Sequence, residues 1–230
     1  MSDTPADSSG PVVPTPTHSS GPVVHSGGVG RPRIVLITGP SGAGKSRLSE
    51  RLKAAHGWPI VRLDDFYREL DDPGLPRSPL GIPDWDHPDS WNAESAVDSL
   101  RSLVETGRCE LPVYDIGRSA ITGHHVVTAD SEDVILAEGL FAARLIAPLT
   151  DEGLLADAVC VCRNRWTTFT LRLTRDLSER RKPPHILLRR GIALLRDEPT
   201  IVGDAVALGA RTASPKQAEQ ELASLISSAT

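Results

Sequence analysis

The chain has 230 residues and a formal net charge of −5 at pH 7, and this length fits one α/β domain with an additional segment. The acidic balance argues against nucleic acid as a partner. No apolar run is long enough to cross a bilayer, and the N-terminal sequence lacks the pattern of a signal peptide. We therefore expect a cytoplasmic protein without a membrane partner, either as a monomer or as a homo-oligomer.

The first segment of the chain differs from the rest in composition. Residues 1–32 are rich in Ser, Pro, Gly and Thr, and the sequence SSGPVV occurs in them twice. Such a composition buries too little apolar surface to offset the entropy of ordering. We expect a disordered tail over residues 1–32 and a folded domain over residues 33–230.

A phosphate-binding motif opens this domain. Residues 33–38 form an apolar, β-branched run typical of a buried parallel strand. Residues 39–46 read GPSGAGKS and fit the pattern G-x-x-x-x-G-K-[ST]. Apolar residues then recur at helical spacing from Lys45 until Gly57. The alternative is a glycine-rich turn between strand and helix, which would not require every fixed position of the motif.

The chemistry of this P-loop follows from its residue types. Glycines let several backbone N–H groups converge on one anion, and the helix N-terminus adds partial positive charge. Lys45 can reach the β- and γ-phosphates of ATP or GTP, and the Ser46 hydroxyl can ligate Mg²⁺. The nucleotide-binding residues expected from the loop are Gly39, Ser41, Gly42, Ala43, Gly44, Lys45 and Ser46.

The elements that follow alternate between strands and helices. Strands or extended segments are expected at residues 60–63, 111–115, 134–137 and 158–162, and helices from about residue 93, over about 166–181, and from residue 215. Residues 69–91 form a long loop, which is usually functional. This order predicts an α/β fold of the P-loop NTPase type, with a doubly wound, mostly parallel sheet, helices on both faces, and ligands at the strand ends.

Two acidic residues are expected at the carboxyl ends of strands. Asp64 follows residues 60–63, and Glu138 follows residues 134–137. Asp64 can accept a proton from an attacking hydroxyl group, and Glu138 can hold Mg²⁺ through water. The alternative is that Asp64 only caps or solvates a loop.

Two further segments carry polar chemistry. Residues 84–91 read DWDHPDSW, in which carboxylates can bind sugar hydroxyls and tryptophans can cover a ring. The alternative is a self-capped turn anchored by its tryptophans. Arg172 and Arg175 share one face of the expected basic helix, which we interpret as a lid over about residues 163–190. The alternative there is a solvated helix face.

In this order, the motifs GPSGAGKS, DDFY (64–67), DWDHPDSW, LPVYD (111–115), EGLF (138–141) and RLTRDLSER (172–180) resemble the uridine/cytidine kinases within the phosphoribulokinase/uridine kinase family. The resemblance runs from about residue 34 to 181. It implies that Asp64 is the catalytic base, and that Lys45 acts on the phosphates. The residues implied to contact the acceptor or the donor are Tyr67, Asp86, Tyr114, Arg172 and Arg175, with Ser46 and Glu138 at the metal.

One departure from the family concerns the acceptor. Ile116 stands where the family has an aromatic residue, and Ser119 stands where it has a histidine; Arg118 can substitute for part of that contact. From the resemblance as a whole, we expect a kinase that uses ATP and Mg²⁺ to phosphorylate the 5′-hydroxyl of uridine or cytidine. The departure at Ile116 and Ser119 leaves other acceptors open. The alternatives are a P-loop kinase of another small alcohol, such as another nucleoside, a vitamin precursor or a sugar phosphate, and a nucleotide-binding regulatory ATPase.

Overall fold

The computed structural model describes residues 33–131, 133–163 and 198–227. The expected tail over residues 1–32 and the expected helix over about 166–181 lie outside the described residues. The same is true of all but the first residue of the expected lid.

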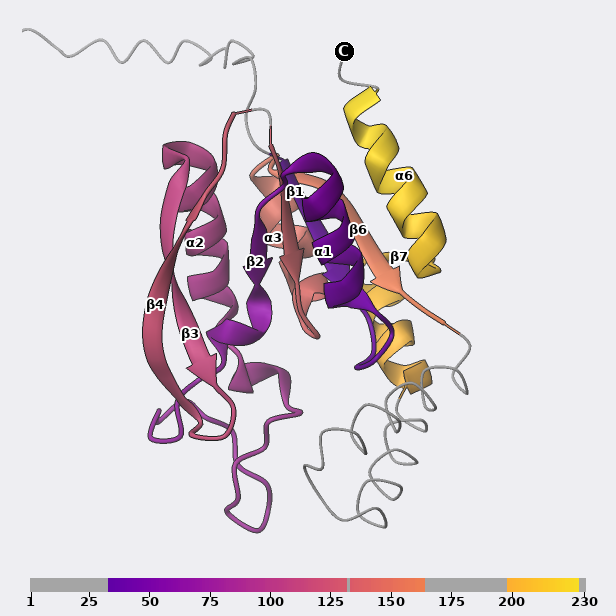
Figure 1. Cartoon of the computed structure of the whole chain (residues 1–230). Helices are drawn as coiled ribbons and strands as arrows, with labels where there is room; N and C mark the ends of the chain where they lie inside the picture. Colours follow the sequence, from indigo (N-terminus) through magenta and orange to yellow (C-terminus); the bar gives the residue numbers. More distant parts are fainter. Residues whose placement is uncertain (1–32, 132, 164–197, 228–230) are drawn as a thin grey trace, which may run out of the picture.

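A parallel sheet forms the centre of the described part of the chain (Figure 1). Within the described residues, it has five strands in the order β2-β5-β1-β6-β7. All neighbouring pairs are parallel. The strands are β1 (Arg33–Thr38), β2 (Ile60–Arg62), β5 (Val134–Glu138), β6 (Leu155–Val161) and β7 (Arg211–Ala213).

Helices cover both faces of the sheet because the central strands are apolar on both sides. In β1, Ile34 and Leu36 face one core and Val35 and Ile37 face the other, and all four are fully buried. The helices α2 (Ala93–Thr106) and α3 (Ile146–Asp151) pack on the first face. The helices α1 (Lys45–His56) and α6 (Pro215–Ser227) cover the second. The predicted doubly wound fold is therefore confirmed.

The helix boundaries follow the signals in the sequence. Helix α1 ends at Gly57, which has a left-handed backbone (φ 80°). The Asn92 side chain caps α2 by accepting a hydrogen bond from the Ser95 N–H (3.1 Å). At α6, Ser214 and Gln217 form the reciprocal bonds of a capping box. Residues 198–207 form a further helical segment. Among the helices in the described ranges, none has the length and apolarity needed to span a membrane.

An antiparallel hairpin is the main element that the sequence analysis missed. It pairs β3 (Arg108–Asp115) with β4 (Ala120–Thr128) outside the main sheet. Only residues 111–115 were expected to be extended. Most of β4 is exposed, and its sequence AITGHHVVT contains a glycine and two histidines instead of an apolar alternation. The sequence therefore gave no periodic signal for the second strand.

Two strand ends differ slightly from expectation. Strand β2 stops at Arg62, and Leu63–Phe66 form a 3₁₀ turn, η1, so Asp64 lies within that turn. Glu138 is the last residue of β5, not the residue after it. Both side chains remain at the carboxyl edge of the sheet, where ligands bind in folds of this kind.

The core on the α2 face supports a stability prediction. Leu100 is fully buried between α2 and the sheet, so Leu100→Ala should lower the free energy of unfolding by about 2–5 kcal/mol, because it removes buried apolar atoms and leaves a cavity. Leu80 is 83% exposed, and Leu80→Ala is the control, with a change within about 0.5 kcal/mol. Urea denaturation measures both. Equal losses in the two variants would contradict the burial pattern.

Candidate active site

The P-loop lies directly against strand β6. Gly39 has a positive φ of 133°, and a Cβ atom there would collide with the Val161 carbonyl. Only glycine permits both that backbone conformation and that approach. Gly44 also has a positive φ, of 105°, where the loop enters α1. These two glycines let the chain turn tightly around an anion-sized space at the start of the helix.

The Lys45 side chain folds back over this loop. Its Nζ donates hydrogen bonds to the carbonyls of Gly39 (2.7 Å) and Pro40 (3.3 Å). This arrangement holds the ammonium charge at the mouth of the loop, beside the backbone N–H groups. The loop and Lys45 together form a site suited to a polyphosphate.

Ser46 and Glu138 form a pair of oxygen donors beside the loop. The Ser46 hydroxyl donates to Glu138 Oε2 (3.1 Å). Glu138 is only 7% exposed, and burial raises its pKa above the usual value, while the Ser46 bond and the Lys45 charge oppose that rise. Mg²⁺ prefers one or two carboxylates together with water and phosphate oxygens. The residues present therefore fit Mg²⁺ next to a bound nucleotide.

Asp64 is held at the edge of the sheet by the residues that follow Glu138. Its Oδ1 accepts a hydrogen bond from the Leu140 N–H (3.1 Å). A Cβ atom on Gly139 would lie 2.8 Å from the Leu63 Cβ and 3.0 Å from Asp64 Oδ1, so a side chain there would push η1 away. Asp64 itself is exposed. The carboxylate is therefore oriented by a backbone donor and remains accessible to a ligand.

One cleft, of about 880 Å³, joins the P-loop to Asp64 and to the aromatic residues beyond it. It is lined by Ser41, Gly42, Gly44, Lys45, Ser46, Arg47, Asp64, Tyr67, Trp85, Asp86, Tyr114, Ile116, Ser119, Glu138, Leu140 and Arg163. The structure therefore brings together residues that are far apart in the sequence. Gly39 and Ala43 shape the loop but do not line the cleft.

Aromatic side chains form the wall of the cleft away from the P-loop. The ring of Tyr67 lies 6.2 Å from that of Trp85, 6.0 Å from Tyr114 and 6.1 Å from Phe141, measured between centroids. Burial strongly raises the pKa of the Tyr67 hydroxyl, which therefore stays neutral. This wall can cover a flat or apolar ligand group.

The segment over residues 84–91 is anchored by one of its tryptophans and places Asp86 at the cleft. Trp91 is buried and its indole N–H donates to the Leu63 carbonyl (2.5 Å), while the Ser90 hydroxyl donates to the Trp85 carbonyl (3.1 Å). Trp91 thus anchors the loop in the core. Asp86 lies at the cleft and is exposed, which leaves its carboxylate accessible to a ligand.

One predicted contact residue lies away from the cleft, and two others are outside the described residues. The Arg118 side chain is 75% exposed, pairs with Asp115 (3.8 Å) and does not line the cleft. Arg172 and Arg175 lie outside the described residues.

Two basic cleft residues, Arg47 and Arg163, were missed from the sequence. Arg47 lies in the first turn of α1. Arg163 follows β6, and its Nε donates to the Ala43 carbonyl (3.0 Å). Its place just beyond the carboxyl end of a parallel strand is the signal that could have identified Arg163.

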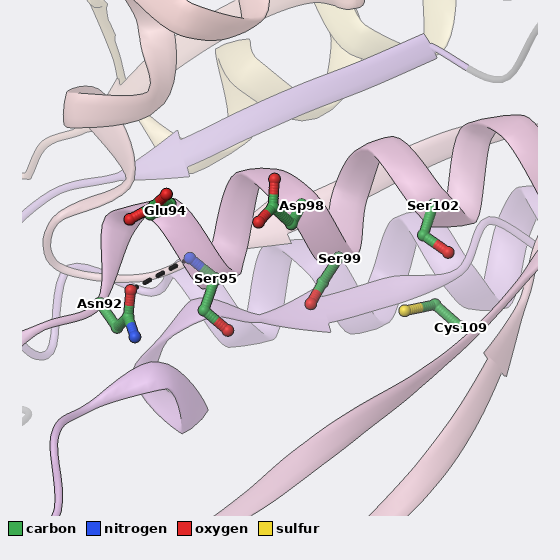
Figure 2. A pocket seen from close by; sticks show the side chains of 7 residues that line it. All are labelled: Asn92, Glu94, Ser95, Asp98, Ser99, Ser102 and Cys109. Atoms are coloured by element: carbon green, nitrogen blue, oxygen red, sulfur yellow. Dashed lines mark hydrogen bonds between the residues drawn. The ribbon is translucent and has the colours of Figure 1, made fainter.

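A second, smaller depression lies between α2 and β3 (Figure 2). Its lining residues are Asn92, Glu94, Ser95, Asp98, Ser99, Ser102 and Cys109. None of them lines the large cleft, and Asn92 is engaged in capping α2. No positive charge is present among them to bind a phosphate, so the larger cleft is the better candidate for a nucleotide site.

Comparisons with known proteins show which proteins the chain is similar to. No protein-family model matches the chain. Among curated proteins, the uridine kinase of Clostridium botulinum (strain 657 / Type Ba4) is 25% identical over 171 residues, which cover 72% of this chain and 79% of that protein. The uridine-cytidine kinase 2-B of Danio rerio is 26% identical over 180 residues, which cover 73% of this chain and 67% of that protein.

A solved structure with a similar fold is that of a candidate fructose transport system kinase from Silicibacter sp. TM1040. Its TM-score is 0.56 at 20% sequence identity, and the match covers 83% of this chain and 90% of that chain. At this identity the likeness concerns the fold alone. The sequence relatives confirm the resemblance to the uridine/cytidine kinases that the motifs predict, and with it the prediction of a small-molecule kinase of the uridine kinase-like type.

Proposed function

We propose that this protein transfers the γ-phosphoryl group of ATP to the 5′-hydroxyl of a pyrimidine ribonucleoside, converting uridine or cytidine to UMP or CMP. The observation that carries the proposal is the single cleft with a P-loop at one end and an aromatic, acidic wall at the other. Donor and acceptor would meet beside Asp64. Catalysis of phosphoryl transfer consists almost entirely of holding the two reactants in line and stabilising the charge of the transition state.

The donor half binds the triphosphate through the P-loop. The loop N–H groups and Lys45 offset the charge of the β- and γ-phosphates. Arg47 and Arg163 add positive charge around the same end of the cleft. When bound there, Mg²⁺ neutralises charge that develops on the phosphates during transfer. Ser46 and Glu138 would hold it, Ser46 directly and Glu138 through water.

Asp64 acts as the general base. It accepts the proton of the acceptor hydroxyl while that oxygen attacks the γ-phosphorus. The Leu140 N–H holds Oδ1 in place, so the carboxylate needs little reorganisation at the moment of transfer. The contacts that we expect from Arg172 and Arg175 to the phosphates belong to residues outside the described part of the chain.

The acceptor half suits an uncharged ring-bearing alcohol. Of the residues described as lining the cleft, the cationic ones, Lys45, Arg47 and Arg163, all belong to the P-loop end, whereas Asp64 and Asp86 lie toward the aromatic wall. Among the described residues, this charge pattern suits an acceptor without a phosphate group, such as a nucleoside. The Tyr67, Trp85 and Tyr114 rings would cover the nucleoside, and Asp86 would bind its ribose hydroxyls.

A kinase of another nucleoside-like alcohol is the second candidate, and Ile116 and Ser119 favour it. Both line the acceptor half of the cleft, and Ile116 is 78% exposed. Neither offers the aromatic face or the imidazole that resembling kinases use on a pyrimidine. A regulatory ATPase without an acceptor is less favoured, because it has no need of this aromatic and acidic wall.

Thermal-shift measurements with a non-hydrolysable ATP analogue and a panel of nucleosides, followed by product analysis with ATP, would test the proposal. Uridine or cytidine should raise the unfolding temperature further when the ATP analogue is present. Their monophosphates should form with ATP. Phosphorylation of a different alcohol alone would favour the second candidate, and ATP hydrolysis without any acceptor would overturn both.

The P-loop lysine provides the first prediction from this proposal. Lys45→Ala should abolish measurable phosphoryl transfer while the fold is retained, because it removes the charge that offsets the phosphates. Coupled-assay turnover and circular dichroism measure the two effects. Lys53→Ala, in the exposed last turn of α1, is the matched control and should retain activity. Turnover near the wild-type value in folded Lys45→Ala would refute the assignment of the P-loop.

The predicted base provides the second. Asp64→Asn should lower kcat by ~10²–10⁴-fold, because the amide keeps the shape and cannot accept the hydroxyl proton. ATP affinity, measured by calorimetry with the non-hydrolysable analogue, should change by less than about threefold, since Asp64 is not part of the P-loop. A fall in kcat smaller than threefold would show that Asp64 is structural.

Asp86 provides the third, on ribose selectivity. Uridine should be a better substrate than 2′-deoxyuridine, because the deoxy form leaves the Asp86 carboxylate without one hydroxyl partner, at about 1 kcal/mol or a factor of ~5 in kcat/KM for this exposed group. Asp86→Ala should bring the two efficiencies close together. The ratio of kcat/KM for uridine to that for adenosine should be smaller than in a typical uridine kinase, because Ile116 and Ser119 lack base-specific groups. Equal efficiency with uridine and deoxyuridine in the wild-type protein would contradict the role of Asp86.

A further inference from the structure

The far end of the β3–β4 hairpin carries the acceptor wall but is weakly buried. We call residues 113–122 the hairpin tip; it includes Tyr114, Ile116 and Ser119, which line the cleft. In the near half, Leu111 is buried in the core below α2, whereas Val113 and Ile121 in the tip are 39% and 38% exposed. A two-stranded ribbon without a buried face is marginally stable in water. The tip therefore needs other interactions to stay in place.

Two backbone N–H groups of the tip are bound by carboxylates. Tyr114 N–H donates to Asp65 Oδ1 (3.1 Å), and Ile121 N–H donates to Glu69 Oε1 (2.9 Å). Both acids lie in residues 64–70, which we call the anchor segment. Hydrogen bonds to a charged acceptor are about twice as strong as neutral ones, so the anchor segment grips both strands of the hairpin.

These bonds occur where the hairpin ladder is irregular. Val113 pairs with Gly123, while Tyr114 pairs with Ile121, so Thr122 is an extra residue in the second strand. Such bulges bend a ribbon and disturb its ladder bonds. The two carboxylates bind the N–H groups of the pair next to this bulge. They are therefore placed to fix the bend that turns the tip toward the cleft.

Further bonds connect the same two segments. The Tyr114 hydroxyl donates to the Arg68 carbonyl (3.0 Å), and Leu70 N–H donates to the Ser119 carbonyl (2.9 Å). Burial raises the pKa of Asp65, while the Tyr114 N–H that it accepts opposes the rise. Because the Asp65 carboxylate is half-buried, it and the Tyr114 N–H have few other hydrogen-bond partners. Loss of this hydrogen bond therefore costs more free energy than loss of an exposed one.

Asp65 is the chain neighbour of Asp64 in the same turn, η1. Asp64 lines the cleft, and Asp65 binds the hairpin. We propose that Asp65 and Glu69 are positioning residues for the acceptor: they hold the hairpin tip, and with it Tyr114, Ile116 and Ser119, at a fixed place relative to the turn that carries Asp64. The kinetic side of this proposal rests on the proposed function, whereas its structural side does not.

The experiment compares Asp65→Ala, Asp65→Asn and Glu69→Ala with the control Glu110→Ala, which removes an exposed carboxylate from the same strand β3. Steady-state kinetics with ATP and uridine give KM for each substrate and kcat. Hydrogen exchange followed by mass spectrometry reports the opening of residues 113–122 and, for comparison, of α1.

Asp65→Ala should raise KM for uridine about tenfold and leave KM for ATP within about twofold, because the acceptor wall is displaced and the P-loop is untouched. Asp65→Asn should restore most of the affinity, since its amide oxygen can accept the Tyr114 N–H. Exchange in the tip should become faster in Asp65→Ala and Glu69→Ala, with α1 unchanged. Glu110→Ala should match the wild-type protein in every measurement.

Equal rises of both KM values, an unchanged exchange rate in the tip, or an equal effect of Glu110→Ala would overturn the proposal. If Asp65→Ala does not fold, the same results are expected for Glu69→Ala, because this variant removes the corresponding hydrogen bond from the Ile121 N–H. If the wild-type protein phosphorylates no nucleoside, the proposed function fails, and the exchange experiment still decides: faster opening of the tip supports the anchor, and no change refutes it.

Discussion

The parallel register of three neighbouring strands determines where the chemistry of this protein is located. In β1, β5 and β2, Ile37 lies beside Glu138, and Glu138 lies beside Arg62. Because parallel strands in register end at one edge, the residues just past each of them meet there. The P-loop, Glu138 and the η1 turn with Asp64 are thus neighbours by construction. A shift of one strand by one residue would turn its side chains to the opposite face and separate these groups.

Backbone segments pack closely at this edge of the sheet, and two glycines make the close packing possible. Gly39 allows the P-loop to pass against the Val161 carbonyl, and Gly139 allows η1 to lie against the end of β5. Each occupies a point where one backbone approaches another more closely than a Cβ atom would permit. The glycines therefore do more than provide flexible turns, because they determine how close the donor site lies to Asp64.

The two halves of the cleft are held by different forces. The donor half is built on buried strands, whose side chains fill both cores, and the hydrophobic effect stabilises it. The acceptor half is built on a loop and a hairpin whose tip is largely exposed, and hydrogen bonds to Asp65, Arg68, Glu69 and Leu70 hold it. Such bonds are directional and individually weaker than core packing. The acceptor half is consequently the part of the site that can move most easily.

The same division explains what the sequence could predict. The strand over residues 33–38, the P-loop, the start of α1 at Lys45 and the capping box of α6 all follow from local patterns, and the structure has them at the expected places. Strand β4 could not be found in this way, because its sequence has no apolar alternation. It is a strand because it pairs with β3. The bonds from Asp65 and Glu69 reach 49 and 52 residues along the chain. No local pattern encodes contacts at such separations.

Candidate site residues divide in the same manner. Lys45 and Ser46 were expected from the P-loop motif, and Asp64 and Glu138 from their place at strand ends; all four line one cleft. Arg118 was expected from its place in a motif alone, and its side chain points to solvent beside Asp115. A residue in a surface turn can rotate away without disturbing the core, whereas a residue at a buried strand end cannot. For Arg118, a place in a motif was therefore not sufficient to predict a side chain at the cleft.

Where an exposed residue lines the proposed acceptor half of the cleft, a substitution can change acceptor selectivity with little change in the free energy of unfolding. Ile116 is 78% exposed, and substitutions at exposed positions usually alter the free energy of unfolding by less than about 0.5 kcal/mol. It nevertheless lines the cleft, where a single added or lost contact alters selectivity by about 1–3 kcal/mol. Gly39 in the P-loop has no such freedom, because a Cβ atom there would collide with the Val161 carbonyl. In the proposed function, the fold thus couples a constrained phosphate site to an acceptor wall that can be altered almost independently of it.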